Sequence, residues 1–244
     1  MTDPEEHGIR HPRPIDLNAD VGEGMPTDRE LLALVTSASV ACGFHAGDAA
    51  TMRALSRDAV ARGVSIGAHV GYRDREGFGR RAIDVPPETV EADTAEQVAT
   101  LEEIARAEGG RVAYVKLHGA LYERCNTDAE CAAAVVQALR AARSPAVLAF
   151  PGSQLIAQAD AAVLATAAEG FVDRGYAADG TLVPRTEPGA ILDEEAAIAQ
   201  ALRLARQEQV RSLCIHGDTP GALTLARRVV DRLRAAGIEL RPFA

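Results

Sequence analysis

The sequence predicts a distorted (β/α) TIM-like barrel with about seven parallel strands, and three observations support this fold class. Short β-branched or apolar runs alternate with longer amphipathic stretches, which is the pattern of parallel strands joined by helical crossovers. The units repeat over 244 residues, a length that α/β barrels use as one domain. Nearly every candidate strand ends in polar residues, and strand ends converge on one face of a barrel. An open doubly wound sheet, the alternative, would gather them at one switch point.

The candidate strands are short apolar runs, and the candidate helices lie between them. The strands are expected at residues 15–18, 38–42, 64–68, 112–117, 146–150, 162–167 and 212–215, with a short terminal strand at 238–241. The helices are expected at residues 28–36, 48–62, 87–108, 127–143, 153–159, 193–208 and 220–236. The helix from Pro87 has the clearest pattern, because its apolar residues recur at three- or four-residue spacing. Gly109 and Gly110 end it.

The chain divides into a disordered N-terminal tail, residues 1–14, and a single barrel domain, residues 15–244. The tail is polar and proline-rich and lacks the apolar stretch of a signal peptide. No apolar run is long enough to span a membrane. The four cysteines have neither C-x-x-C nor zinc-ribbon spacing, so we expect reduced thiols in a cytoplasmic protein. The net charge of −9 argues against nucleic acid or an anionic membrane as a partner.

The basic residues single out one position. Lys116 is the only lysine among 26 basic residues, so we expect it to be needed as a lysine. Lys116 and His118 are two residues apart and therefore share one face of a strand. If that face points into a barrel, the buried ammonium requires a carboxylate or an anionic substrate. Lys116 is the strongest single candidate for a functional residue.

Four of the six histidines each follow a different candidate strand. A single one would be interpreted as a core histidine, but four in equivalent positions predict that at least two face a common site. They are His45, His69, His118 and His216.

Acidic and amide side chains follow the first strand, in the segment DLNADVGE. Alternation places Asp16, Asn18 and Asp20 on one side of that strand. Paired carboxylates can hold a metal or divide the roles of general acid and base, whereas the simpler alternative is a polar turn. Function is favoured, because charges inside a barrel mouth are costly unless they are used.

Two long loops, residues 67–81 and 169–185, are rich in charge and glycine. Long loops in compact domains are often lids or binding loops. Arg80 in the first, and Arg174 and Arg185 in the second, are candidates to bind a carboxylate or phosphate, although solvated or salt-bridged surface loops remain the alternative. The sequence contains no Walker A loop, no G-x-G-x-x-G at the start of a helix and no G-x-S-x-G elbow.

The chain resembles the LamB/YcsF family of prokaryotic 5-oxoprolinase A subunits from Ile15 to the C-terminus. The resemblance rests on six motifs in family order, namely DLNADVGEG, ACGFHAGD, GAHVGYRDREGFGRR, VKLHGALY, FVDRGYAADGTLVPR and CIHGD. It implies a barrel of the glycoside hydrolase/deacetylase type and ATP-dependent opening of the lactam of 5-oxo-L-proline to L-glutamate. It also implies partner subunits B and C. Because no Walker loop is present, we expect ATP with Mg²⁺ to be shared with those partners.

The resemblance and the motifs together suggest roles for the candidate residues. Asp20 and His45 would exchange protons with water, and Lys116 and His118 would stabilise developing negative charge. The expected substrate-binding residues are Asn18, His69, Arg80, Arg174, Arg185 and His216.

Two other functions remain open. In a metal-dependent amidase or deacetylase that needs no ATP, Asp20, His45 and His69 would hold a divalent metal with an open water position. A protein that only binds a small carboxylate is less favoured, because simple binding does not need four histidines at strand ends. The sequence is also compatible with a homo-oligomer.

Overall fold

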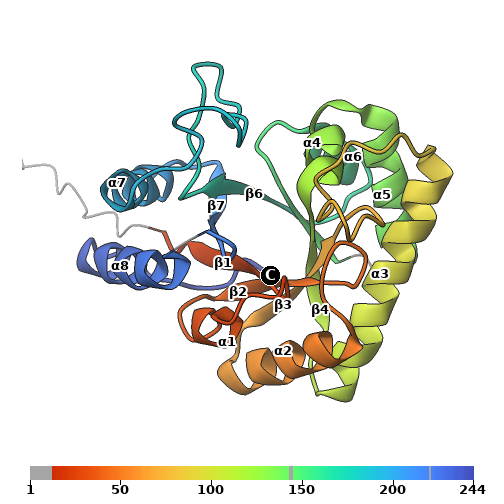
Figure 1. Ribbon diagram of the computed structural model, residues 1–244, viewed down its shortest axis with the longest axis horizontal. Coiled ribbons are helices and arrows are strands. Elements are labelled where there is room, and N and C mark those ends of the chain that lie inside the picture. The colour runs from red at the N-terminus through yellow and green to blue at the C-terminus, as the bar shows by residue number, and fades with distance from the viewer. Residues whose placement is uncertain (1–12, 143–144, 220) are drawn as a thin grey trace, which may run out of the picture.

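The computed structural model describes residues 13–142, 145–219 and 221–244. In this part of the chain, parallel strands form one closed barrel in chain order, as the sequence predicts (Figure 1). The strands are β1 (Asp16–Val21), β2 (Ser37–Ala41), β3 (Ser65–Val70), β4 (Val112–Leu117), β5 (Ala146–Ala149), β6 (Thr166–Phe171) and β7 (Val210–His216).

The strand register brings the polar strand ends to one level. β1 closes the barrel against β7, and Asp20 pairs with His216. On the other side of β1, Asp20 lies beside Ser39 of β2. His69 of β3 pairs with Lys116 of β4. The mouth of the barrel therefore carries charged and ionisable side chains from strands that are far apart in sequence.

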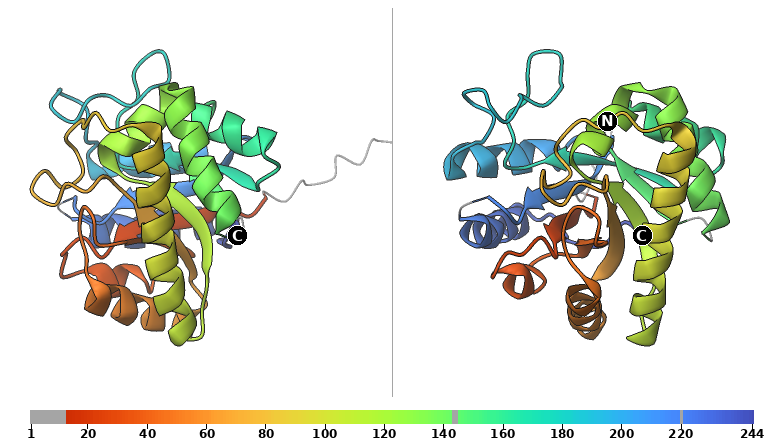
Figure 2. Two further views of the ribbon diagram at one scale, coloured as in Figure 1. Left: turned by 90° about the vertical axis from the view of Figure 1, so that its right-hand side faces the viewer. Right: turned by 45° about the vertical axis from the view of Figure 1, so that its right-hand side comes forward.

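Helices surround the barrel, and the long α3 runs along its outer side (Figure 2). Aspartate or serine side chains cap four of them, since Asp48, Asp128, Ser153 and Asp193 accept hydrogen bonds from backbone N–H groups of the first turn. The helices are α1 (Asp28–Leu31), α2 (Ala49–Arg62), α3 (Pro87–Ala107), α4 (Gly119–Thr127), α5 (Ala129–Ala141), α6 (Gln154–Ala161), α7 (Glu194–Leu204) and α8 (Ala222–Ala235).

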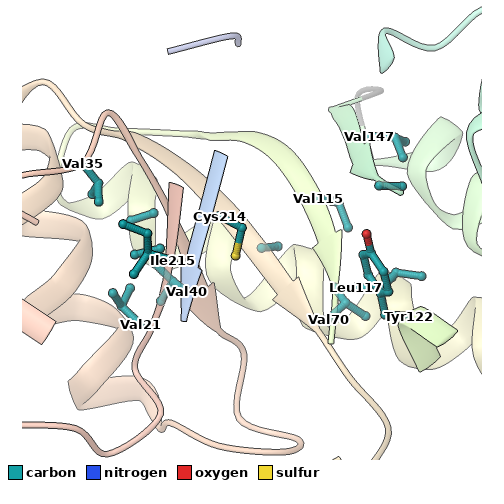
Figure 3. Close-up of a cluster of buried hydrophobic side chains, with 14 of the residues drawn as sticks. Val21, Val35, Val40, Val70, Val115, Leu117, Tyr122, Val147, Cys214 and Ile215 are labelled. Atoms are coloured by element: carbon teal, nitrogen blue, oxygen red, sulfur yellow. The ribbon is translucent and has the colours of Figure 1, made fainter. Parts of the chain in front are cut away.

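The apolar core lies between the barrel and its helices, and much of the barrel interior is polar. Val21, Val40 and Ile215 belong to the buried apolar cluster (Figure 3). The alternate residues of β1 face inward, because Asp16 accepts hydrogen bonds from Ser37 and Ser212. The polar interior continues upward through Asn18 and Lys116 to the mouth.

Some predicted boundaries are wrong. The sixth strand begins at Thr166 rather than at 162, because residues 162–165 belong to the turn that ends α6, where the Leu164 N–H donates to the Ala159 carbonyl. The predicted helix 127–143 is α5, which begins only at Ala129 because Asp128 has an extended conformation and caps it. α4, which precedes it, was not predicted. The predicted terminal strand is reduced to a single bridge between Ile15 and Leu240.

The remaining differences concern the chain ends and the first helix. α1 ends at Leu31 and does not reach residue 36, because Thr36 donates its hydroxyl to Asp16 and its N–H to Leu17 at the start of the barrel. Residues 1–12 of the predicted disordered tail lie outside the described residues. Among the described helices, none combines the length and apolar character needed to cross a bilayer.

Candidate active site

A cavity of about 1180 Å³ opens at the carboxyl ends of the strands. Asp20, Lys116, Glu169 and His216 line it at the level of the barrel mouth. The segment between β6 and α7, residues 172–193, stands away from the barrel (Figure 2) and contributes a further wall through residues 174–186. The cavity therefore lies where the strand-end residues and the second arginine-bearing loop meet.

Lys116 forms the charged centre of the cavity floor. Its Nζ lies 2.9 Å from Asp20 Oδ1 and 3.1 Å from Glu169 Oε2. It also lies 3.2 Å from Asn18 Oδ1 and 3.0 Å from Cys214 Sγ. Burial alone would lower the pKa of Lys116, but Asp20, Cys214 and Glu169 together raise it well above its usual value. The ammonium therefore stays charged and balances two buried carboxylates.

Three histidines gather around one carboxylate beside this centre. Glu23 Oε1 lies 3.4 Å from His45 Nε2, 3.5 Å from His69 Nε2 and 3.2 Å from His118 Nδ1. The rings of His45 and His118 stack with centroids 3.9 Å apart. His118 Nε2 is 2.8 Å from the Phe78 carbonyl. Because a carbonyl only accepts, Nε2 is the donor, and Nδ1 is the nitrogen that faces the cluster.

Burial shifts the titration of these groups in opposite directions. It lowers the pKa of His45 to about 4, because a buried imidazolium loses its hydration. Burial would raise the pKa of Glu23, but the three histidine side chains around its carboxylate hold that pKa well below its usual value. At neutral pH the cluster thus presents a carboxylate to a neutral His45.

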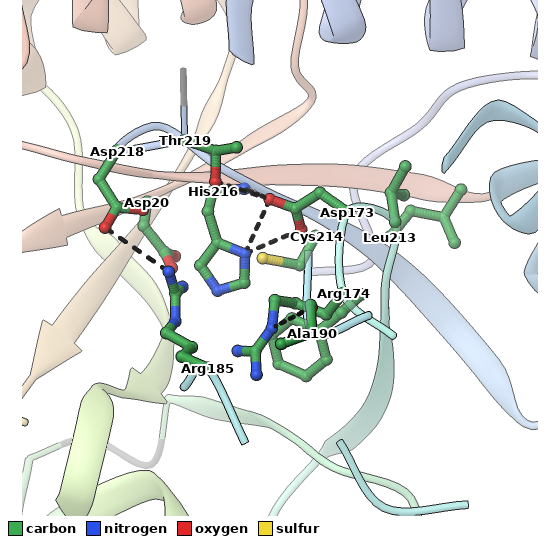
Figure 4. Close-up of polar contacts among 12 residues, drawn as sticks. Asp20, Asp173, Arg174, Arg185, Ala190, Leu213, Cys214, His216, Asp218 and Thr219 are labelled. Carbon is green, nitrogen blue, oxygen red and sulfur yellow. Dashed lines mark hydrogen bonds and ion pairs between the residues drawn. The ribbon is translucent and has the colours of Figure 1, made fainter. Parts of the chain in front are cut away.

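His216 and Asp173 form a separate pair (Figure 4). His216 Nδ1 lies 2.9 and 3.1 Å from the two carboxylate oxygens of Asp173. The Thr219 hydroxyl donates to the same carboxylate at 3.1 Å. Asp173 therefore fixes the proton on Nδ1 and leaves Nε2 of this cavity-lining ring as the free nitrogen.

The three predicted arginines all line the cavity, but their contacts differ. Arg80 pairs with Asp218, and Arg185 lies 3.9 Å from the same carboxylate. Arg174 is buried and donates to the backbone carbonyls of Ala190 and Val183, at 3.1 and 2.7 Å. Arg174 therefore holds the segment after β6 together, and Arg80 and Arg185 are the more accessible cations.

The structure separates the predicted catalytic residues into two groups. Asp20, Lys116 and His118 line the cavity, as do His69 and His216. Asn18 lies below Lys116 and orients it. His45 is 1% exposed and stacks behind His118 rather than lining the cavity. His45 is therefore less well placed to meet a substrate than the sequence suggested.

Three acids of the site were not singled out from the sequence, namely Glu23, Glu169 and Asp173. All three lie in the motif segments, at strand ends or just beyond them. In the predicted metal triad, Asp20 pairs with Lys116 at 2.9 Å and approaches His69 only at 3.5 Å. Glu23 takes the central place among the histidines. Strand-end position was the available signal, but it does not say which acid meets which partner.

Comparisons with known proteins first define the class of fold. A family 4 carbohydrate esterase from Streptomyces lividans superposes with a TM-score of 0.55 at 12% identity, over 95% of this chain and 93% of that one. At this identity the likeness shows the fold alone, a deacetylase-type (β/α) barrel.

Closer relatives then show the family. The model of the LamB/YcsF family matches residues 15–244. A 5-oxoprolinase A subunit from Streptomyces avermitilis is 52% identical over 94% of this chain and 100% of that protein. The lactam utilization protein of Thermus thermophilus superposes with a TM-score of 0.87 at 38% identity, over 94% of this chain and 100% of that one. The chain belongs to the LamB/YcsF family.

Proposed function

We propose that the chain is the A subunit of an ATP-dependent 5-oxoprolinase and opens the lactam of 5-oxo-L-proline to L-glutamate together with subunits B and C. Family membership and the 52% identical relative, which is named as a 5-oxoprolinase A subunit, support this function. The main structural support is the cavity floor. There the Lys116 ammonium lies between the carboxylates of Asp20 and Glu169, and a histidine with a free Nε2 lines the same cavity. Such a floor suits a small polar substrate whose ring must be held while water attacks.

The reaction needs activation, because a lactam carbonyl is a poor electrophile. Transfer of a phosphoryl group from ATP to the lactam oxygen would supply that activation, and the sequence has no Walker A loop to bind it alone. Lys116 places positive charge at the cavity floor, where negative charge develops on the former carbonyl oxygen. Arg80 and Arg185 provide the cations for the substrate carboxylate.

His216 is the best-placed group for proton transfer. Asp173 fixes its proton on Nδ1, so Nε2 is free to accept a proton from water. Water oxygen adds to the phosphorylated ring carbon, the C–N bond breaks, and the leaving nitrogen takes up a proton. The acyl phosphate that results is then hydrolysed by a second water, which releases L-glutamate and inorganic phosphate. His216 can return its proton to that nitrogen, while Asp20 beside Lys116 orients the water. These roles replace the one expected for His45, which lies behind His118.

Glutamate release tests the proposal. The purified chain receives 5-oxo-L-proline and ATP, alone and with subunits B and C from the same genome. Glutamate and ADP are expected in equal amounts and only in the full mixture. Glutamate formed by the chain alone without ATP would overturn the ATP-dependent mechanism.

A metal-dependent amidase is the second candidate, and the cluster of three histidines and Glu23 favours it. It would form glutamate without ATP and would lose activity on treatment with a chelator. If folded subunits B and C give no glutamate in any mixture, the oxoprolinase proposal fails and other cyclic and acetylated amides become the substrates to test.

A further inference from the structure

We propose that Glu23, His45, His69 and His118 form a binding site for one divalent transition-metal ion of the zinc type. The four residues come from the ends of four consecutive strands, because Glu23 follows β1, His45 follows β2, His69 lies in β3 and His118 follows β4. One ligand atom from each lies within 4.8 Å of all the others. This site stands beside the Lys116 centre and does not depend on the proposed function.

The spacing of the ligand atoms fits a bound ion. Metal–ligand bonds of about 2.0–2.1 Å in a tetrahedral zinc site place the ligand atoms roughly 3.3 Å apart. Glu23 Oε1 lies between 3.2 and 3.5 Å from the three ring nitrogens. His69 Nε2 and His118 Nδ1 are 3.0 Å apart. These four distances are close to the spacing that one such ion requires, and the remaining pairs of ligand atoms lie within 4.8 Å.

The cluster also contains buried polar atoms without hydrogen-bond partners among the described residues. These are Glu23 Oε1, both ring nitrogens of His45, and His69 Nδ1. The side chains of Glu23 and His45 are 4% and 0% exposed. Buried polar atoms of folded proteins nearly always have a partner, because leaving one without costs about 1–3 kcal/mol. A metal ion bound by Glu23 Oε1 and His45 Nε2 removes that cost.

Surrounding groups prepare the ligands. The hydrogen bond from His118 Nε2 to the Phe78 carbonyl turns the lone pair of Nδ1 toward the cluster, as outer groups do at metal sites. Gly71 and Gly79 let their loop cover the rings, since an added Cβ would lie 2.7 Å from His45 Nδ1 at Gly71 and 2.9 Å from His45 Cβ at Gly79. The loop thus shields the site from bulk water.

The ligand types decide the class of metal. Three imidazoles and one carboxylate favour Zn²⁺ and its neighbours Co²⁺ and Ni²⁺, whereas Mg²⁺ and Ca²⁺ prefer oxygen ligands. Asp20 Oδ2 lies 3.5 Å from His69 Nε2 and belongs to the cavity wall. Asp20 therefore lies next to the site without being one of its four ligands.

A second group, Asp20, Cys214 and His216, has similar spacing but does not fit. Asp20 and Cys214 already contact the Lys116 ammonium, at 2.9 and 3.0 Å. The positive charge of Lys116 repels a cation there. His216 therefore serves as the matched control, because it is a histidine of the same cavity outside the proposed ligand set.

Metal titration of untagged, chelator-stripped protein tests the site. The parent carries His7→Ala and His11→Ala, so that these histidines do not bind the ion. Zn²⁺ titrated in a calorimeter is expected to bind at one equivalent, and Co²⁺ to give the visible absorption of a tetrahedral site. Binding should also raise the Tm, because the ion joins four strands.

Variants identify the ligands. Glu23→Gln and His45→Ala are each expected to weaken Zn²⁺ binding at least 100-fold and to abolish the Co²⁺ spectrum. His216→Ala should bind like the parent. Circular dichroism checks that each variant is folded, and Glu23→Gln keeps the size of the side chain. Absence of saturable binding in the parent, unchanged binding in both ligand variants, or equal loss in His216→Ala would overturn the site, whatever the outcome of the glutamate assay.

Discussion

A lysine ammonium buried between two carboxylates gives the cavity floor its electrostatic character. Lys116 is 2% exposed, and Asp20 and Glu169 are buried on either side of it. Lys116 Nζ lies 2.9 Å from Asp20 and 3.1 Å from Glu169. Among the described residues, no other cation is as close to either carboxylate. Removing the lysine therefore leaves both charges without compensation, which typically costs about 3–5 kcal/mol of stability.

Lys116→Met should lower glutamate turnover in the full mixture of subunits at least about 100-fold, the scale of a lost charge-stabilising donor. It should also lower the free energy of unfolding. The double variant Lys116→Met/Glu169→Gln separates these effects, because it removes one uncompensated carboxylate. The double variant should regain much of the stability measured in urea but not the turnover. Recovery of turnover together with stability would show that Lys116 is structural only.

Asp16 couples pH to stability at the other end of the barrel interior. Its carboxylate accepts hydrogen bonds from Thr36, Ser37 and Ser212, yet burial raises its pKa from 3.8 to about 6. Between these values the folded state binds the proton more tightly than the unfolded state. The stabilisation is thus complete below about pH 4 and is lost as the pH rises through 6.

Asp16→Asn should flatten this dependence. The rise of the pKa from 3.8 to about 6 corresponds to about 3 kcal/mol. Urea unfolding between pH 4 and pH 7.5 measures this contribution. The free energy of unfolding should fall less steeply with pH in the variant than in the wild type. Asp48, an exposed N-cap of α2, provides a comparison through Asp48→Asn, which keeps the interior unchanged. Equal slopes for wild type and Asp16→Asn would contradict the role of Asp16.

At the scale of the element, β3 shows how a glycine makes room for a large ring inside the barrel. A Cβ at Gly67 would lie 2.2 Å from the Tyr114 ring of β4. The Tyr114 hydroxyl lies 3.1 Å from the Ser39 hydroxyl of β2, so the ring bridges the interior. The pairing of β3 with β4 shifts register between Ile66 and Gly67. The glycine and the tyrosine therefore act as one packing unit.

Gly67→Ala should destabilise the protein by about 1–3 kcal/mol through overpacking. Its backbone conformation is not the cause, because Gly67 has no positive φ. In the Tyr114→Leu background the same change should cost much less, since the ring that collides with the new methyl group is gone. Thermal unfolding of the four proteins in this double-mutant cycle gives the coupling. Additive effects would mean that the close approach is relieved elsewhere.

The elements also show where prediction from sequence works. The apolar stripe of α3 predicts both ends of this helix to within one residue, because a long apolar stripe at helical spacing fits only a helix. The alanine-rich stretch 161–168 has no alternation of apolar and polar residues that would mark where the strand begins. The predicted start of β6 is therefore four residues too early. The sequence analysis does not predict α4, because the VKLHGALY motif indicates a functional site and Asp128 is not recognised there as a helix cap.

At the scale of the whole molecule, the fold class and the polar strand ends were predictable from the sequence. Which side chains contact one another at the barrel mouth was not. Alternation of strands and helices sets the barrel, and the barrel sets a common mouth. Which acid meets Lys116 depends on β1, β4 and β6 facing one another across the closed interior. The pairing of Glu23 with three histidines likewise depends on the loop conformations after β1 and β2. Local sequence carries no signal for these distances.

The C-terminal segment closes the base of the barrel. Ile238 is 2% exposed, the Phe243 ring lies 5.1 Å from the Tyr114 ring, and Ser65 donates to the carbonyl of Ala244 at 2.9 Å. Deleting residues 238–244 should cost at least about 2 kcal/mol from the loss of one buried isoleucine and lower the Tm by roughly 4 °C or more. Arg241→Ala, at an exposed position, should leave the Tm unchanged in calorimetry. An unaltered Tm of the truncated protein would contradict this role.

The same segment brings the two ends of the barrel domain together. The Ile15 N–H donates to the Glu239 carbonyl at 2.9 Å, and the Arg241 N–H donates to the Ile15 carbonyl at 3.0 Å. A short linker could therefore join these ends, and new termini could be opened at the exposed turn near Glu208 without breaking any strand pair. The strand with which the chain begins is then a matter of choice, while the order of the strands around the barrel stays fixed. A protein fused at either terminus would lie at the base of the barrel and would leave the mouth of the barrel open to substrate.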